Sequence, residues 1–241
     1  MLNSVVKSDW LLKLSLPTQN DLPSDDGVPM ETERHKKQMD LLIYSLAPWL
    51  GERGYVGGNM FVYYSVKQVR YQDFQGPDVF VVLDVPKKER KSWVVWEEGK
   101  SPDIVIELLS ASTAGYDKNA KKQVYQNQLK VAEYYWFDPF APEDLAGFEL
   151  RGGSYQPQSP DVRTRLISQQ LKLALVRWYG NYEGIETVWL RWSHLNGELL
   201  PTPQEARDIE AKRADTEAKA RQAAEIEITR LQALLAGKSN H

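Results

Sequence analysis

The feature that most limits the fold of this chain is a set of short apolar runs with the composition of buried strands. Residues 60–66, 79–83, 93–96 and 104–109 are rich in β-branched and aromatic side chains, which favour strands. The runs are nearly continuous in hydrophobicity, whereas strands with one wet face alternate with polar residues. We therefore expect a sheet that is covered by other structure on both faces.

Helical patterns flank these runs. Residues 31–49 carry apolar side chains at helical spacing, and a second helix is predicted over residues 117–128 with Asp117 as its N-terminal cap. Another apolar run, residues 133–138, follows that helix and ends before a proline. A strand, a helix and a further strand in this order imply a right-handed crossover and an α/β fold.

The sequence after residue 138 predicts peripheral strands and then a long helix. Further strands or hairpins are predicted over residues 145–150, 171–178 and 187–192. From Pro203 the composition shifts to Ala, Glu, Lys, Arg and Gln without a glycine until Gly237, which predicts one long helix ended by that glycine. We accordingly expect a domain of residues 1–202 and a helical extension of residues 203–241.

The extension carries a short apolar seam. Ala224, Ile228, Leu231 and Leu235 follow a 4-3-4 spacing, as in a coiled coil, but the pattern lasts for little more than a heptad and a half. Two alternatives stay open: the helix joins two copies in a homodimer, or it packs back on its own domain.

Composition excludes several classes of protein. The 241 residues include no cysteine, which rules out disulfides, thiolate zinc sites and cysteine nucleophiles. The net charge of −3 gives no overall positive field, so any binding of nucleic acid must be local. The chain also shows no apolar run long enough to span a membrane and no secretory leader, so we expect a cytoplasmic protein without a membrane partner.

Two acids stand at the ends of apolar runs. Asp78 follows Gly76-Pro77 at the start of one run, and Glu107 lies near the end of another. Burying an acid such as Glu107 in an apolar strand is costly unless it has a partner. Magnesium prefers oxygen ligands and usually takes one or two carboxylates from the protein. Asp78 and Glu107 therefore predict a site for Mg²⁺ (or Mn²⁺).

A lysine on the following helix completes the set. Lys121 is four residues after Asp117 and four before Tyr125, so it lies above Tyr125 on one helical face. The ammonium could orient or help deprotonate an attacking water and neutralise charge on phosphate oxygens. Lys118, expected on the same face one turn earlier, is the reserve candidate, whereas Lys122 should point elsewhere.

Together these segments resemble a known family. The motifs that carry the resemblance are Gly76-Pro77-Asp78, the run from Pro102 to Thr113, Asp117-x-x-x-Lys121-x-x-x-Tyr125, and Glu133 to Pro139. In this order they are similar to the Uma-two family of restriction-endonuclease-like proteins, within the PD-(D/E)XK nuclease superfamily, over about residues 15–200. The resemblance implies a mixed central sheet flanked by helices and magnesium-dependent cleavage of DNA.

The resemblance also assigns roles to individual residues. It makes Asp78 and Glu107 the metal carboxylates and the backbone carbonyl of Leu108 a further ligand. The lysine of the superfamily would fall at Leu109, which cannot serve, and the family pattern moves the amine to the helix, where it matches Lys121.

Three further candidates come from the region of the first helix. Family members commonly carry an acid near the N-terminus, which here corresponds to Glu31 or Glu33, and the choice between them stays open. His35 is interpreted either as a phosphate contact or as part of a solvated helical face.

The basic run of residues 87–91 is interpreted either as a DNA-facing loop or as a solvated hairpin tip.

The sequence thus predicts a metal-dependent endonuclease that hydrolyses phosphodiester bonds, with DNA as its partner. The alternative is a catalytically inactive nucleic-acid-binding or protein-interaction module on the same fold. A third interpretation is an oligomeric scaffold assembled through residues 203–236.

Overall fold

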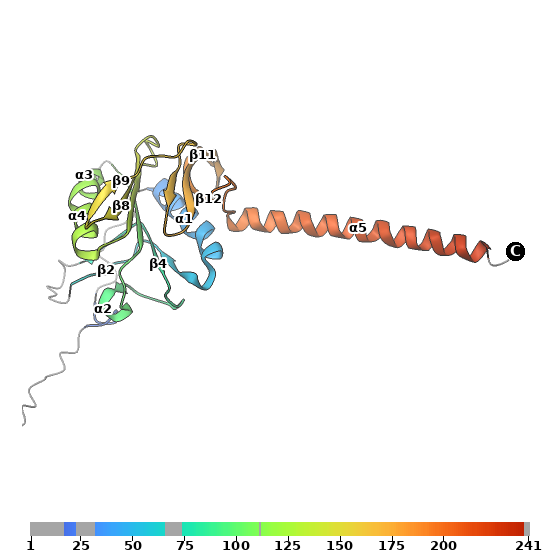
Figure 1. Ribbon diagram of the computed structural model, residues 1–241, viewed down its shortest axis with the longest axis horizontal. Coiled ribbons are helices and arrows are strands. Elements are labelled where there is room, and N and C mark those ends of the chain that lie inside the picture. The colour runs from blue at the N-terminus through green and yellow to red at the C-terminus, as the bar shows by residue number, and fades with distance from the viewer. Residues whose placement is uncertain (1–16, 23–31, 66–73, 111, 239–241) are drawn as a thin grey trace, which may run out of the picture. The chain divides into compact units, whose positions relative to one another are not determined.

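The computed structural model of the protein describes residues 17–22, 32–65, 74–110 and 112–238, with side chains described as far as residue 232. Its contacts divide the chain into two units, Met1–Leu200 and Pro201–His241. Figure 1 shows the elements of both units. No helix in the described ranges is both long and apolar enough to cross a membrane.

A six-stranded mixed sheet forms the centre of the first unit. Its strands, in spatial order, are β1 (Gly54–Gly57), β4 (Val79–Leu83), β6 (Ile104–Leu108), β7 (Glu133–Phe137), β8 (Leu145–Arg151) and β9 (Ser154–Pro157). Only β6 and β7 are parallel to each other, and every other pair is antiparallel. The mixed sheet, the flanking helices and the added hairpins confirm the predicted fold class.

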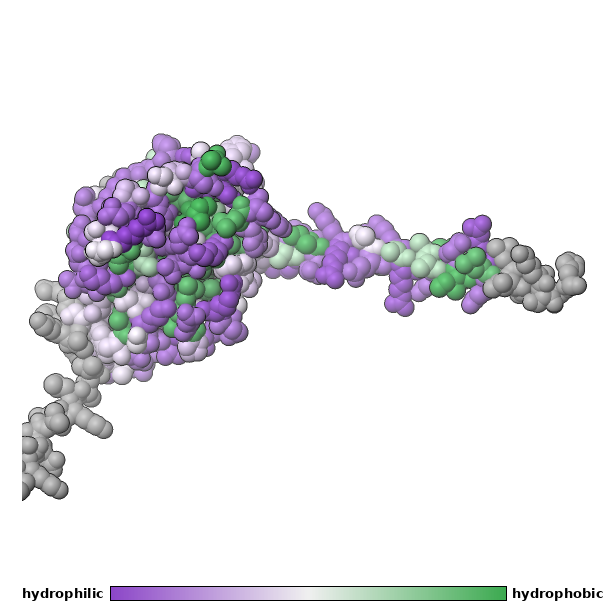
Figure 2. All heavy atoms as spheres, viewed as in Figure 1, coloured by the Kyte–Doolittle hydropathy of each residue, from purple (hydrophilic) through white to green (hydrophobic). Residues whose placement is uncertain are grey.

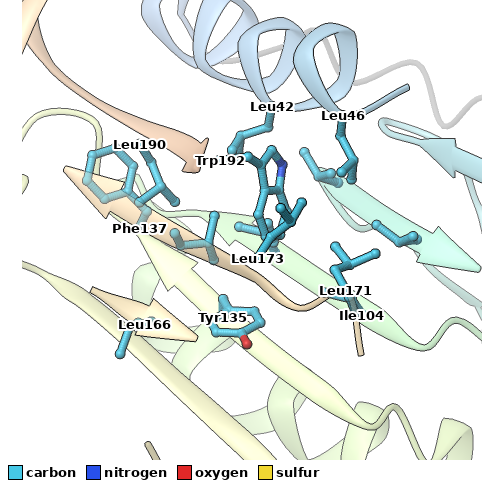
Figure 3. Packing of buried hydrophobic residues seen from close by; sticks show 14 of the residues in the cluster. Leu42, Leu46, Ile104, Tyr135, Phe137, Leu166, Leu171, Leu173, Leu190 and Trp192 are labelled. Atoms are coloured by element: carbon cyan, nitrogen blue, oxygen red, sulfur yellow. The ribbon is translucent and has the colours of Figure 1, made fainter. Parts of the chain in front are cut away.

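One face of this sheet packs on a helix and a second sheet. The helix α1 (Glu33–Leu50) begins at the N-cap Thr32, whose side chain accepts a hydrogen bond from the backbone of His35. The second sheet is antiparallel and contains β10 (Leu166–Ser168), β11 (Leu173–Tyr182) and β12 (Ile185–Ser193). Leu42, Leu46, Trp192 and alternate residues of the central strands fill the space between these layers (Figure 3).

The opposite face is covered by the helical crossover between β6 and β7. The crossover consists of α3 (Ala114–Tyr116), a π-helical turn (Asp117–Lys121), α4 (Lys122–Val124) and a second π-helical turn (Tyr125–Leu129). The predicted start of this helix was wrong, because the helix begins at Ala114. Asp117 therefore lies inside the helix and does not cap it, and its buried side chain is available to Lys121.

A small third sheet differs from the prediction in length. It contains β3 (Phe74–Gln75), β2 (Val62–Tyr63) and β5 (Trp93–Val94). The strand predicted over residues 93–96 is wrong in its second half, where α2 (Val95–Glu98) begins. Gly99 ends α2 in the left-handed conformation at φ 73°, with its N–H bonded to the Val95 carbonyl. A short apolar run cannot distinguish a strand from a buried helical turn by periodicity alone.

Shorter connections complete the first unit. A 3₁₀ turn, Gly51–Arg53, follows α1 and leads directly into β1. Of the strand predicted over residues 60–66, the described residues 60–65 contain only the two residues of β2, which pairs with β3 and β5, and residue 66 lies outside the described residues.

The second unit contains one helix, α5 (Pro203–Lys238), which ends one residue past Gly237. Thr202 and Glu205 form a reciprocal capping box, with hydrogen bonds of 3.2 and 2.8 Å. Ion pairs at i,i+4 spacing, such as Arg213 with Glu217, line a helix that is largely hydrophilic (Figure 2). Ile228 and Leu231 of the predicted seam are exposed. The coiled coil stays a prediction.

Candidate active site

Glu107 is the buried centre of the candidate site. Val105 belongs to the cluster beneath the helical crossover, and Glu107, two residues further along β6, points to the same side of the sheet. The side chain is 0% exposed. The Tyr125 hydroxyl donates to its Oε1 at 2.8 Å, and Lys121 Nζ donates to its Oε2 at 2.7 Å. Both oxygens of the buried acid therefore have a partner from the crossover.

Lys121 binds three acceptors from separate segments. Besides Glu107, its ammonium lies 3.3 Å from Asp117 Oδ1 and donates to the Gly76 carbonyl at 3.1 Å. Asp117 is itself buried. The π-helical turn brings Asp117, Lys121 and Tyr125 to one side, as the spacing predicted for the last two. The contact of Asp117 with Lys121 was missed, because Asp117 was predicted to cap the helix.

Asp78 completes the set from the neighbouring strand. The antiparallel register of β4 and β6 pairs Val79 with Ile106, which places Asp78 opposite Glu107. Asp78 is half-buried, and its Oδ2 accepts a hydrogen bond from the Leu108 N–H at 2.7 Å. Gly58 packs so closely on the backbone of Asp78 that a Cβ there would overlap the Asp78 carbonyl oxygen. Asp78 is therefore held through its side chain by Leu108 and through its backbone by the close packing of Gly58.

The electrostatics of the site show a surplus of negative charge. Burial raises the pKa of Glu107 to about 8, a shift that Lys121 opposes and that Asp78 and Asp117 reinforce. Burial also raises the pKa of Asp78, although Lys121 and a hydrogen bond with Glu107 oppose the change. Burial alone would lower the pKa of Lys121, but Glu107, Asp78 and Asp117 outweigh it and raise that pKa. Three acids thus surround one ammonium.

His35 contacts the backbone atom that the family resemblance made a metal ligand. Its Nε2 lies 3.0 Å from the Leu108 carbonyl oxygen, and because a carbonyl only accepts, Nε2 carries the hydrogen. Its Nδ1 lies 3.2 Å from Thr32 Oγ1. The residue is buried, so the interpretation of a solvated face was wrong. Thr32 was missed; a threonine three residues before His35 at a helix start is the usual signal of an N-cap.

The other candidates are not brought to Glu107. Glu33 has a side chain that is 74% exposed and pairs with Lys37 at 2.9 Å, a hydrogen bond that lowers the pKa of Glu33. Lys118 pairs with Asp144, so its predicted place as the reserve amine on the face of Lys121 was wrong. Glu31 lies outside the described residues.

Two further charged residues lie outside the site. Lys122 points away from the acids, with its ammonium 3.3 Å from the centre of the Phe148 ring. Asp103, the acid at the start of β6, accepts a hydrogen bond from Leu83 N–H at 2.7 Å and pairs with Lys100. It therefore fixes the sheet edge and takes no part in the site.

The basic run of residues 87–91 is largely neutralised. Arg90 is buried and its guanidinium binds both oxygens of Glu98, at 2.9 and 3.0 Å. Lys88 pairs with the same carboxylate at 2.9 Å, and Lys87 pairs with Glu52 at 3.4 Å. The run does not offer a set of unpaired cations to a polynucleotide.

The donor atoms of the site suit a hard cation, although no group of three or more His, Cys, Asp or Glu side chains in the described ranges is arranged to hold a metal. The candidate set is different in kind, because it combines the carboxylates of Asp78 and Glu107 with the Leu108 carbonyl. Two carboxylates and a carbonyl are oxygen donors of the type that Mg²⁺ takes alongside water. Their surplus negative charge also favours a divalent cation.

Comparison with known proteins places the chain in a family of this class. Residues 25–178 match the model of the Uma2 family, described as "Putative restriction endonuclease". This match covers most of the first unit and includes Asp78, Glu107 and Lys121. The fold is that of a restriction-endonuclease-like protein, and the chain belongs to the Uma2 family.

Individual relatives are more distant. The chain is 38% identical over 64 residues to the uncharacterized protein sll1609 of Synechocystis sp., a match that covers 27% of this chain and 34% of that protein. The matched part thus spans about a third of the length of this relative. A crystal structure of a nuclease of DUF820, termed putative in its description, from Anabaena variabilis aligns with a TM-score of 0.46 at 12% identity, covering 64% of this chain and 90% of the other.

Proposed function

We propose that this protein is a metal-dependent endonuclease that hydrolyses phosphodiester bonds in DNA, acting in the cytoplasm. The observation that carries the proposal is the pairing of two buried acids, Glu107 and Asp117, with the single ammonium of Lys121, next to Asp78 on the neighbouring strand. Such a set of buried acids is costly to maintain for stability alone, because apolar residues would fill the same space with less desolvation.

Asp78, Glu107 and the Leu108 carbonyl are the atoms that would hold Mg²⁺ or Mn²⁺. The bound ion would supply Lewis-acid stabilisation of the phosphate oxygens and lower the pKa of the attacking water. Each carboxylate oxygen of Glu107 has two lone pairs, so its bonds to Lys121 and Tyr125 leave capacity for a further partner.

Lys121 acts as a fixed positive charge. Because its pKa is raised, its ammonium stays protonated at neutral pH and is not a base. It therefore orients the attacking water and neutralises charge that develops on the phosphate. Tyr125 and His35 are positioning residues: the former holds the Glu107 carboxylate, and the latter holds the Leu108 carbonyl.

Nicking of supercoiled plasmid DNA in Mg²⁺ tests the proposal. We expect the wild-type protein to nick the plasmid and both Asp78→Asn and Glu107→Gln to lose this activity while keeping their circular dichroism spectra. Glu52→Gln is the matched control, because Glu52 is exposed and pairs only with Lys87. Equal activity of the wild type and Glu107→Gln would refute the proposal.

A binding module without turnover is the second candidate. It is favoured by the same ion pair, since Lys121 and Tyr125 together supply a hydrogen-bond donor to each oxygen of Glu107. Titration calorimetry with Mn²⁺ separates the enzyme from the binding module. An enzyme binds the ion and loses this binding in Glu107→Gln, whereas a module shows no heat of binding in the wild type or in Glu107→Gln.

The α5 seam is proposed as the contact of a homodimer. Ile228 and Leu231 are exposed on a largely hydrophilic helix, and a second copy would cover them. Sedimentation of the full chain and of a chain truncated before Pro203 tests this: a dimer that becomes a monomer supports it, and two monomers contradict it.

A further inference from the structure

We infer that the substrate at this site is an unpaired DNA strand whose bases stack on Phe140 and Tyr116. This inference rests on the proposed function and adds the substrate class to it. Both rings are largely exposed, at 54% for Phe140 and 52% for Tyr116; Tyr116 directly precedes the buried acid Asp117, and Phe140 lies against Arg34 and His35 of α1.

The topology brings the two rings to the same edge of the sheet. Tyr116 lies in α3, on the segment that leaves β6 just after Leu108, and Phe140 lies in the loop that leaves the parallel strand β7. The ends of these strands are joined by a hydrogen bond of 2.8 Å from Leu109 N–H to the Phe137 carbonyl. Ligands of α/β sheets gather where parallel strands end.

Phe140 is held rigidly in spite of its exposure. Asp138 Oδ1 accepts hydrogen bonds from the backbone N–H groups of Phe140 and Ala141, at 2.7 and 3.0 Å. The guanidinium of Arg34 lies 4.4 Å from the centre of the Phe140 ring, and the imidazole of His35 lies 6.2 Å from it. His35 in turn contacts the Leu108 carbonyl. Phe140 is thus an ordered aromatic platform one side chain away from the proposed ligand Leu108.

Tyr116 borders the same acids from the crossover. It directly precedes Asp117, and its hydroxyl donates to Gln75 Oε1 at 3.5 Å. Gln75 is followed by Gly76, whose carbonyl accepts from Lys121. Tyr116 is therefore linked to Lys121 through the segment of Gln75 and Gly76, by one hydrogen bond at each of these residues. About half of the Tyr116 surface is exposed to solvent.

The exposed rings, and not the charges, favour a single strand over a duplex. Duplex binding depends mainly on Lys and Arg contacts to phosphates. The described cations around the site are engaged with acids: Lys121 with Glu107 and Asp117, and Lys118 with Asp144. Arg34 contacts a ring and the Pro139 carbonyl. Exposed rings instead bind unpaired bases by stacking, which tolerates any sequence.

Fluorescence anisotropy of labelled oligonucleotides in Ca²⁺ tests the inference, because binding is read without cleavage. We expect the wild type to bind a single strand at least about tenfold more tightly than the blunt duplex of the same sequence. Stacking of one base predicts that Phe140→Ala and Tyr116→Ala each weaken single-strand binding by about 5- to 100-fold and leave duplex binding unchanged.

Matched variants keep the test specific. Phe140→Tyr and Tyr116→Phe retain the rings and should bind like the wild type. Tyr179→Ala removes a ring that is 67% exposed on β11, outside the site, and should have no effect. Tighter binding of the duplex, or wild-type affinity in both alanine variants, would overturn the inference, as would a protein partner captured at Phe140 while no oligonucleotide binds.

The outcome is distinguishable from failure of the proposed function. If the rings are needed for single-strand binding but no strand is cleaved in Mg²⁺, the inference stands and the nuclease activity does not. If the protein nicks duplex DNA through Glu107 and the alanine variants cleave normally, the nuclease activity stands and the inference fails.

Discussion

Lys121 and Glu107 form an ion pair of 2.7 Å in which the carboxylate is fully buried. The pair joins the central sheet to the helical crossover, and Tyr125 and Asp117 extend it on either side. Its geometry is the structural basis of the proposed chemistry, and it also makes the site a determinant of stability.

Removing the amine should destabilise the protein and abolish nicking. In Lys121→Met, Glu107 would remain buried next to Asp78 and Asp117 without a cation, and breaking such a buried pair costs about 3–5 kcal/mol when the acid is ionised. Urea unfolding measures the loss of stability, and the plasmid assay measures activity. Lys118→Met, which breaks the half-exposed pair with Asp144, should cost less than about 1 kcal/mol and keep activity. Full activity of Lys121→Met would argue against its role.

The free energy of unfolding should fall as the pH rises. The pKa of Glu107 is raised from its ordinary value of 4.5 to about 8, so the folded state binds more protons than the unfolded chain between these values. Its contribution is complete below pH 4.5 and is lost as the pH rises through about 8. Burial also raises the pKa values of Asp78 and Glu133, which act in the same direction.

Urea titrations at a series of pH values from about 5 to 9 measure this slope. Glu107→Gln should flatten it by up to a few kcal/mol across the range, whereas the exposed control Glu52→Gln should leave it unchanged. A stability that increases with pH over the same range would show that folding does not raise the pKa of Glu107.

Tyr125→Phe should separate stability from positioning. The variant loses the hydrogen bond to Glu107 Oε1 and should unfold about 1–3 kcal/mol more easily. Tyr155→Phe is a matched control, because its buried hydroxyl donates to the Val131 carbonyl at 3.0 Å, outside the site. Both variants should lose stability, but only Tyr125→Phe should also lose nicking rate. The same rate in the two variants would remove Tyr125 from the site.

His35→Ala should weaken the binding of Mn²⁺ by about 10- to 100-fold, the usual effect of removing a residue that orients a ligand. The reason is that the Leu108 carbonyl loses its hydrogen-bond donor. Calorimetry measures the affinity, His35→Gln should restore part of it through its amide N–H, and His194→Ala serves as the control. Unchanged affinity in His35→Ala would show that the Leu108 carbonyl is not a ligand.

Much of the fold could be predicted because hydrophobic runs report burial directly. The apolar residues of β4, β6 and β7 are buried on both faces, as their nearly continuous apolar runs predict. The pattern failed at residues 93–96, because four apolar residues fit a buried helical turn as well as a strand. Only the placement of Gly99 in the left-handed conformation distinguishes the two.

The candidate site could be predicted only in part. An acid within an apolar strand requires a partner, which pointed to Glu107, and helical spacing pointed to Lys121 and Tyr125. Asp117 was misplaced because the helix begins three residues earlier than its capping preference suggested. His35 was interpreted either as a phosphate contact or as part of a solvated face, and its contact with Leu108 spans 73 positions of sequence, a distance that no local pattern reports.

The most direct measurement is the anomalous scattering of Mn²⁺ in crystals of the full chain. We expect one peak within coordination distance of an Asp78 oxygen, a Glu107 oxygen and the Leu108 carbonyl oxygen. This peak should be absent from crystals of Glu107→Gln. A peak at another set of residues, or none at this one in the wild type, would contradict it.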